Sequence, residues 1–364
     1  MHQLTCVADY EKKCQSLIEK SALDYFKSGS GEEETLKRNK DAFKKLRIRP
    51  RVLINVSKVN LNVEIFGSKL EWPVGVSPTA MQKMAHPDGE VASARAAGKA
   101  GSLFILSSLS TTSLEEVAEK APDTIKWFHS HLFKDREMTE NLVIRAEKAG
   151  YKAIVFTVDQ PVFGIRKTCD FKLPSHLSLA NLVCIESENN NISDTSSGIA
   201  NHSLEIFNAS ITWKDVEWFT QFTKLPVLLK GVLTREDAIL ALNHGVKGII
   251  VSNHGGRQFD GVPSSIEVLP EIVEAVGKDM FVAFDSGVYQ GVDAFKALAL
   301  GAKLVLLGRA VLWGLGVDGQ KGVEDILAIV KNELNVSMSL AGCTEVNKIG
   351  NKTVVHENYF STCK

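Results

Sequence analysis

Short apolar runs alternate with longer amphipathic stretches from about residue 74 to about residue 335. The runs are rich in Val, Ile, Leu and Phe, which is typical of parallel strands that are buried on both faces. The predicted strands span residues 74–77, 103–106, 125–128, 153–158, 227–229, 248–251, 281–284 and 304–307. The predicted helices span residues 88–100, 113–121, 135–149, 213–223, 234–244, 264–277, 291–300 and 322–335. Eight strand–helix repeats in roughly 270 residues predict a single closed (β/α)8 TIM barrel of the α/β class rather than a six-stranded open sheet.

We expect residues 1–364 to form one domain with three parts. Residues 1–60 form an N-terminal segment, of which 1–48 are predicted to be helical and are mostly polar. The barrel takes residues 61–340, and residues 341–364 form a C-terminal tail.

Two irregular stretches accompany the repeats. Residues 63–72 predict a β-hairpin that turns around Gly67 and Ser68. Residues 168–210 are polar and rich in Ser and Asn, and no apolar periodicity runs through them. Loops of that length are often lids, so we predict a mobile insertion after the fourth strand, over the mouth of the barrel.

The charge, cysteine content and hydropathy of the chain exclude several classes of partner and site. The chain has 364 residues, of which 44% are apolar and 23% charged, and its formal net charge is −1. A nearly neutral protein does not attract nucleic acid or an anionic membrane as a general partner, so any anion site must be local. The six cysteines are scattered without a C-x-x-C pair, so we expect no metal site and no disulfide framework. The N-terminus lacks the apolar core of a signal peptide and no apolar run approaches a membrane span, so we expect neither secretion nor a membrane anchor.

Polar side chains follow almost every predicted strand, and the ends of parallel barrel strands converge in space. These strand ends carry Pro78, Thr79, Ala80, Ser107, Ser108, His129, His131, Thr157, Asp159, Lys230, Ser252, His254, Arg257, Asp285, Ser286, Gly287, Gly308 and Arg309. This number of polar and charged side chains is larger than turns after strands alone would require. A single histidine after a strand is more often structural, but the polar residues at the other strand ends favour a functional role for His254.

Residues 252–258, Ser-Asn-His-Gly-Gly-Arg-Gln, combine more potentially catalytic and ligand-binding residues than any other predicted strand end. A histidine can move protons near neutral pH, and an arginine can hold a carboxylate through two parallel hydrogen bonds. The two glycines between them let the backbone approach a ligand closely. We therefore predict a base, His254, and an anion clamp, Arg257, at the end of one strand.

Lys230 ends an otherwise apolar strand. A buried lysine needs an anionic partner, so one interpretation is a cation that faces a cofactor; the other is a side chain that reaches along the barrel rim to water. Residues 286–287 and 308–309 occupy the usual phosphate site of such barrels. The segment 314–319 matches G-x-G-x-x-G formally, but it lies several residues after its strand, and we interpret it as a chance match.

From about Tyr10 to about Cys343, the chain resembles the FMN-dependent 2-hydroxy-acid oxidase family, which includes glycolate oxidases. The resemblance is carried by residues 78–87 (PTAMQKMAHP), 252–258 (SNHGGRQ), 295–302 (FKALALGA) and 339–343 (SLAGC).

The resemblance implies roles for particular residues. His254 would act as the base on the substrate, with Asp159 hydrogen-bonded to it, and Lys230 would lie near flavin N1 and stabilise the reduced anion. The substrate would be held by Tyr25, Arg166, Arg257 and His131. The FMN-binding residues would be Thr79, Ala80, Ser107, His129, Thr157, Lys230, Ser252, Asp285, Ser286, Gly287, Tyr289, Gly308 and Arg309.

Several positions depart from the family pattern. His129 and His131 stand where the family has Gln and Tyr, and Tyr289 stands where it has a phosphate-binding Arg. Gln160 replaces a usual Thr, and Leu109 a usual Trp. The loss of one charge-assisted phosphate contact, about 1.5–3 kcal/mol, predicts at least a tenfold weaker affinity for FMN.

Three hypotheses follow. The leading one is FMN-dependent oxidation of a small (S)-2-hydroxy acid to the 2-oxo acid, with oxygen reduced to hydrogen peroxide. The alternative is an FMN-binding member of the family whose turnover is weakened or lost through His129, His131 and Tyr289. The third, a barrel isomerase or aldolase that uses Lys230 as a Schiff-base amine, needs no flavin. The resemblance also implies a homo-tetramer and a peroxisomal location, otherwise cytoplasmic, although the C-terminal Ser361-Thr362-Cys363-Lys364 is a poor match to a Ser-Lys-Leu signal.

Overall fold

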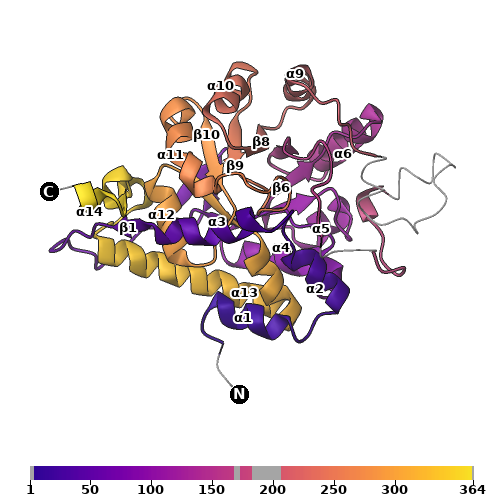
Figure 1. The fold of residues 1–364 in the computed structure, drawn as a ribbon. Coiled ribbons are helices and arrows are strands. Elements are labelled where there is room, and N and C mark those ends of the chain that lie inside the picture. The colour runs from indigo at the N-terminus through magenta and orange to yellow at the C-terminus, as the bar shows by residue number, and fades with distance from the viewer. Residues whose placement is uncertain (1–3, 168–172, 183–205, 363–364) are drawn as a thin grey trace.

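The computed structural model describes residues 4–167, 173–182 and 206–362. Eight parallel strands, several of which are visible at the centre of Figure 1, close into a barrel with neighbours in the order β4, β5, β6, β7, β8, β9, β10 and β11. They span Val74–Val76, Leu103–Ser107, Ile125–Ser130, Ile154–Thr157, Val227–Val232, Gly248–Val251, Phe281–Phe284 and Leu304–Leu307. Helices surround the strands, so the predicted TIM barrel is confirmed.

The helices of the repeats also begin and end close to their predicted limits. They are α4 (Gly89–Lys99), α5 (Leu114–Lys120), α6 (Arg136–Lys148), α9 (Trp213–Phe222), α10 (Arg235–Asn243), α11 (Ser265–Val276), α12 (Gly291–Ala299) and α13 (Arg309–Ala341). Two of them begin at polar N-caps: the hydroxyl of Ser113 accepts from Glu116 N, and that of Thr234 from Asp237 N. Only α13 differs strongly, because the prediction began it at residue 322.

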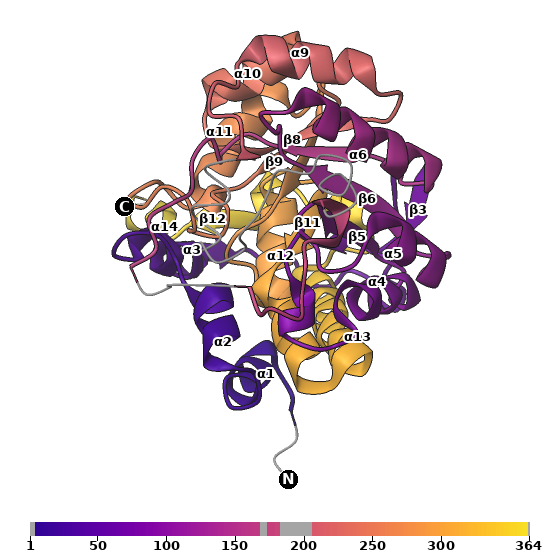
Figure 2. The same cartoon turned by 90° about the vertical axis from the view of Figure 1, so that its right-hand side faces the viewer.

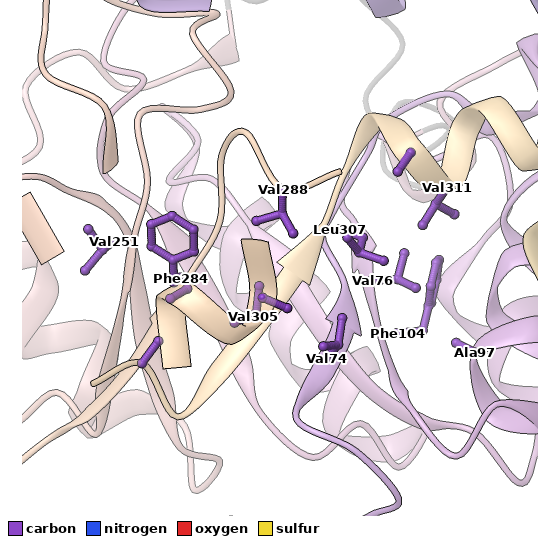
Figure 3. Close-up of a cluster of buried hydrophobic side chains, with 14 of the residues drawn as sticks. Val74, Val76, Ala97, Phe104, Val251, Phe284, Val288, Val305, Leu307 and Val311 are labelled. Atoms are coloured by element: carbon purple, nitrogen blue, oxygen red, sulfur yellow. The ribbon is translucent and has the colours of Figure 1, made fainter. Parts of the chain in front are cut away.

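The strand residues alternate between two cores. Side chains that face outward pack against the helices; Figure 3 shows Val74, Val76 and Phe104 grouped with Ala97 of α4 and Val311 of α13. Side chains that face inward fill the barrel itself. The inner core comprises Leu103, Ile105, Trp127, Ala153, Val155, Leu228, Ile250, Ala283, Leu304 and Leu306, with Ile65 and Leu70.

The predicted hairpin closes the amino-terminal end of the barrel. Its strands β2 (Val63–Ile65) and β3 (Ser68–Leu70) pair antiparallel. The central turn residues are Phe66 and Gly67, both at positive φ, rather than the predicted Gly67 and Ser68. The Phe66 ring lies 5.8 Å from Trp127 and 5.0 Å from Phe281 between ring centroids, so the hairpin plugs the barrel floor with aromatic contacts.

The N-terminal segment is mainly helical, as predicted, and its helices are α1 (Val7–Cys14), α2 (Lys20–Lys27) and α3 (Glu34–Lys44). Helix α1 lies beside α13 in both views of the molecule (Figures 1 and 2). The helical prediction is wrong for residues 46–48, which form β1 (Leu46–Ile48) and pair antiparallel with β12 (Val354–His356). Alternating apolar residues over only three positions are too short a signal to reveal a partner some 300 residues away. The C-terminal segment also contains 3-10 turns at Val346–Lys348 and Asn351–Thr353 and a last helix, α14 (Tyr359–Thr362).

Helix α13 starts directly after β11 and contains the G-x-G-x-x-G match. The helix breaks at Asp318 and Gly319, and its two parts then pack closely. A Cβ on Gly322 would lie 2.0 Å from the carbonyl oxygen of Gly314. The glycines of this segment therefore serve a helix–helix contact, consistent with a chance match to the nucleotide-binding pattern.

Gly322→Ala is expected to lower the free energy of unfolding by about 3 kcal/mol, because the methyl group meets main chain that no side-chain rotation can move. The matched control is Gly350→Ala, where a Cβ has no neighbour within 4 Å and φ is −143°. Urea unfolding of the two variants and the parent measures the difference. Equal midpoints for all three would contradict the packing role.

Candidate active site

Strict alternation along the strands places one inward-facing residue of each strand at the carboxyl end of the barrel, above the apolar inner core. These eight positions are Ser77, Ser107, His129, Thr157, Lys230, Ser252, Asp285 and Gly308. Seven of them carry polar side chains and the eighth has none. The inner core thus changes from apolar to polar at the mouth, which is where the sequence predicts the site.

A cavity opens above this polar layer and encloses about 1120 Å3 of empty space out to the solvent. Its walls include the predicted residues Tyr25, Thr79, Ala80, Ser107, His129, His131, Arg166, Lys230, His254, Arg257, Asp285, Ser286, Gly287, Tyr289, Gly308 and Arg309. The other predicted residues, Thr157, Asp159 and Ser252, lie behind this wall and contact residues that form it.

The loop after β9 has an unusual backbone that explains its two glycines. His254, Gly255 and Gly256 all have positive φ, at 57°, 65° and 75°. A Cβ on Gly255 would lie 2.8 Å from Nη1 of Arg309, and one on Gly256 would lie 2.7 Å from the amide nitrogen of Leu36. Only glycine fits both the conformation and the space. The left-handed conformation of a histidine is a local strain of the kind that clusters at functional sites.

Buried hydrogen bonds hold this strained loop in place. Asn253 and Asn39 of α3 exchange two amide hydrogen bonds, at 2.8 and 2.7 Å. The hydroxyl of Ser252 accepts from the amide of His254 at 3.0 Å, and that of Ser286 accepts from the amide of Gly255 at 3.1 Å. The N-terminal segment and the loop after β10 therefore both fix the position of the histidine.

His254 and Asp159 form an ion-pair contact, with 2.9 Å between Nδ1 and Oδ1. Burial lowers the pKa of His254, and the carboxylate of Asp159 opposes that shift. Burial opposes ionisation of Asp159, but the charges of His254 and Lys230 still hold its pKa below the ordinary value. Gly231, at φ 111° on a β8 bulge, makes room for this carboxylate, because a Cβ there would lie 2.4 Å from Asp159. A neutral imidazole oriented by an anion can act as a base.

Lys230 does not reach along the rim to water. Its side chain is only 4% exposed, and its ammonium lies 3.4 Å from the carboxylate of Asp285. It also donates to the hydroxyl of Ser252 at 3.0 Å. The Asp285 carboxylate accepts from the hydroxyls of Ser77 and Ser286 at 3.0 and 2.9 Å. Lys230 is thus a buried, paired cation in the cavity wall, as the first interpretation of the sequence expects.

Two arginines converge on the carboxyl end of α2. Arg257 Nη1 donates to the carbonyls of Tyr25 and Ser28 at 2.8 and 2.9 Å. Arg309 donates to the carbonyls of Phe26, Gly255 and Ser28 at 2.8 to 3.0 Å. Cations at a helix carboxyl terminus satisfy its free carbonyls and its dipole. Burial and the charge of Arg257 lower the pKa of Arg309 to about 10.

Tyr25 contacts two guanidinium groups. Its ring centroid is 4.9 Å from the Arg257 guanidinium and 5.6 Å from that of Arg166. Within the described residues, Nε and Nη2 of Arg257 carry no hydrogen bond, so they are available to an anion. The structure therefore brings the predicted substrate-binding residues Tyr25, Arg166 and Arg257 to one side of the cavity.

The two histidines after β6 line the cavity with different partners. His129 Nε2 is hydrogen-bonded to the hydroxyl of Thr157, while its Nδ1 is buried without a partner among the described residues. Burial lowers the pKa of His129 well below the usual range and that of His131 to about 3. Both rings are therefore neutral at physiological pH. The His131 nitrogens lie 3.3 Å from the hydroxyl of Ser108 and 3.3 Å from Oε1 of Gln160.

The predicted insertion, 168–210, falls mainly on residues 168–172 and 183–205, which lie outside the described ranges. At its described carboxyl end, Phe207 stacks on His131 with ring centroids 4.4 Å apart. This end of the segment therefore touches a residue of the cavity wall.

Sequence reasoning missed several residues that the structure places at the site. Asn39 and Lys40 of α3 line the cavity, and Gly231 shapes the wall behind it. The Lys-Gly pair at the end of β8 is a signal for a bulge that could have drawn attention to Gly231. Nothing in the local pattern of α3 distinguishes Asn39 and Lys40 from other polar positions of that helix.

No helix in the described ranges 4–167, 173–182 and 206–362 is both long and apolar enough to span a membrane.

Comparisons with known proteins agree on one family. A family model described as FMN-dependent dehydrogenase matches residues 14–356. 2-Hydroxyacid oxidase 1 of Mus musculus is 45% identical, over 100% of this chain and 99% of its own. Glycolate oxidase 1 of Zea mays is 44% identical, over 98% of this chain and 97% of its own. The crystal structure of mandelate oxidase with (S)-4-hydroxymandelic acid superposes with a TM-score of 0.90 at 38% identity, over 97% and 98% of the two chains. The resemblance inferred from the sequence is confirmed: this chain belongs to the FMN-dependent dehydrogenase family.

Proposed function

We propose that the protein oxidises a small (S)-2-hydroxy acid to the corresponding 2-oxo acid, with FMN as cofactor and oxygen as the final acceptor. The observation that carries the proposal is the His254–Asp159 pair on the same cavity as Arg257 and Arg166. A base and two guanidinium groups are what removal of a proton from a hydroxy carboxylate requires. The relatives named 2-hydroxyacid oxidase and glycolate oxidase cover nearly the whole chain, which supports the same substrate class.

The cavity suits FMN in its charge and in the open space beside Gly308. Lys and Arg side chains line it at Lys40, Arg166, Lys230, Arg257 and Arg309, whereas Asp285 is its only carboxylate within the described residues. Such a surplus of cations favours an anionic ligand. At Gly308 a Cβ would have no neighbour within 4 Å, so this end of the wall leaves open space at the start of a helix, where phosphate groups are favoured.

When bound, FMN supplies a two-electron acceptor that passes the electrons on to oxygen and so yields hydrogen peroxide. We assign the phosphate end to Gly287, Gly308 and Arg309, and the ribityl chain to Asp285 and Ser286. The ring system is assigned to Thr79, Ala80, Ser107, His129, Thr157, Lys230 and Ser252. The Lys230 ammonium, buried beside Asp285, is placed to stabilise negative charge on the bound ring system.

The substrate carboxylate is assigned to Arg257 and Arg166, both of which contact the Tyr25 ring. Because Nη1 of Arg257 is fixed by main-chain carbonyls, the guanidinium is preorganised and loses little entropy on binding. Neutral His254 then accepts a proton from the substrate, and Asp159 stabilises the imidazolium that forms. His131 contributes to the same wall, although its contacts to Ser108 and Gln160 occupy both nitrogens.

No observation favours the competing hypotheses. A family member with lost turnover would be expected to have lost a residue of the acid–base or carboxylate-binding set, and His254, Asp159, Arg257 and Arg166 are all retained at one cavity. A Schiff-base mechanism needs a free amine, whereas the Lys230 ammonium is ion-paired with Asp285. A homo-tetramer and a peroxisomal location stay predictions that rest on the resemblance.

The first test is direct reduction of the bound flavin. Under anaerobic conditions, glycolate, lactate or a longer 2-hydroxy acid should bleach the yellow parent protein, and under air the mixture should produce hydrogen peroxide. His254→Gln should bind FMN normally but bleach about 100- to 10,000-fold more slowly, because it lacks the base. The matched control is His244→Gln, since His244 stacks on Trp213 away from the cavity. A yellow parent protein that no 2-hydroxy acid bleaches would contradict the proposal.

The second test concerns the pH profile. His254 must be neutral to accept a proton, and burial lowers its pKa, so kcat/KM should fall on acidification only below pH 6.5, the ordinary value for histidine. Asp159 raises the pKa of His254 against that burial. Asp159→Asn should therefore move the acid limb to still lower pH and reduce kcat/KM by about 100-fold or more, because the imidazolium loses its counter-charge. Asp279→Asn, on an exposed turn, is the control. An acid limb that moves to higher pH would refute the assigned role of Asp159.

A further inference from the structure

Lys40 is a cation at the cavity that the sequence comparison with the family did not assign. It lies on α3, lines the cavity, and its ammonium lies 3.9 Å from the centroid of the Tyr289 ring. Tyr289 itself stands where the resemblance leads one to expect an arginine. The ring face holds the ammonium by a cation–π contact, which fixes the end of an otherwise flexible side chain.

The surroundings of Lys40 are those of the proposed phosphate end. Helix α3 packs directly on the loop after β10, because a Cβ on Gly287 would lie 2.3 Å from the carbonyl oxygen of Asn39. Glu11 of α1 connects Lys40 with Arg309: its carboxylate lies 3.8 Å from the Lys40 ammonium, and it raises the pKa of Arg309 against the effect of burial. Lys40 and Arg309 therefore share one electrostatic neighbourhood at the wall near Gly308.

We propose that Lys40 binds the phosphate group of FMN, with the Tyr289 ring holding its ammonium in place. The inference rests on the proposed function, in that it takes the phosphate to lie at Gly287, Gly308 and Arg309. The cation comes from a helix of the N-terminal segment and takes the place of the arginine that the loop after β10 lacks. The weakened affinity for FMN expected from Tyr289 alone is thus partly offset.

A role as an ordinary surface lysine accounts less well for the geometry. The Lys40 side chain is 44% exposed, and its carboxylate neighbour Glu11 lies at the outer limit of ion-pair distance. An exposed pair of that length contributes little. A phosphate dianion is a stronger partner for three ammonium donors than a distant monovalent carboxylate.

The test compares FMN with riboflavin, which lacks the phosphate. The full-length protein is stripped of flavin and titrated with each compound, with quenching of flavin fluorescence as the readout. Lys40→Met should weaken FMN binding by about three- to tenfold, because the lysine is half-exposed, and should leave riboflavin binding unchanged. Lys37→Met, one turn earlier on α3 and exposed, should change neither. Added salt should shrink the difference between the parent and Lys40→Met for FMN.

The outcomes separate this inference from the proposed function. Equal weakening of FMN and riboflavin would assign Lys40 a structural role and overturn the inference, as would unchanged FMN binding. Arg309→Lys tests the placement of the phosphate by the same comparison. If that variant weakens FMN selectively and Lys40→Met does not, the placement stands and the Lys40 inference fails. If the parent binds FMN and riboflavin equally, the proposed phosphate placement fails as well.

A second variant pair tests the compensation between positions 40 and 289. Tyr289→Arg should tighten FMN binding and make Lys40→Met nearly neutral in its background, because the new guanidinium supplies the missing charge. Glu11→Gln should also tighten FMN binding, since it removes the anion that competes for Lys40. Full additivity of Tyr289→Arg and Lys40→Met would contradict a shared phosphate contact.

Discussion

A surplus of positive charge, buried at Lys230 and half-buried at three arginines, governs the mouth of this barrel. Arg166, Lys230, Arg257 and Arg309 line one cavity, and Asp285 is the only carboxylate on its wall within the described ranges. Taking cations out of water is costly unless each finds a partner. Main-chain carbonyls that accept hydrogen bonds from Arg257 and Arg309, and the ion pair of Lys230 with Asp285, offset part of this desolvation energy. Bound anions would offset the remainder. The site is therefore complementary to a phosphate and a carboxylate before either arrives.

The same charges explain why the N-terminal segment is part of the site. Carbonyl groups at the end of α2 accept hydrogen bonds from Arg257 and Arg309, and Asn39 of α3 exchanges hydrogen bonds with Asn253. Helices outside the barrel thus hold the arginine positions and the left-handed conformation of His254. A barrel without these helices would carry the same residues at its strand ends but would not hold them in this geometry.

Much of this arrangement follows from the sequence, and the remainder shows what periodicity cannot encode. Strand positions follow from short apolar runs that alternate with amphipathic helices, so a strand end such as Lys230 could be placed without coordinates. The pairing of β1 with β12 could not be predicted, because each strand has only three residues and the two lie near opposite ends of the chain. The residues of 252–258 indicated His254 as a base, and the resemblance added Asp159 as its partner by matched position. Neither the pattern of the sequence nor the resemblance indicated Lys40, since its proposed role depends on how α3 packs against Tyr289.

The two histidines that depart from the family pattern are consistent with the charge argument. A protonated imidazole at His129 or His131 would add to a cavity already rich in cations, and the cations nearby disfavour it. Burial keeps both rings neutral, so each acts as a hydrogen-bonding group without charge, as the expected Gln and Tyr would. The substitutions change the size and donor geometry of this wall but leave the electrostatic field around His254 and Lys230 in place. Retention of the field, rather than of each side chain, is what the acid–base chemistry requires.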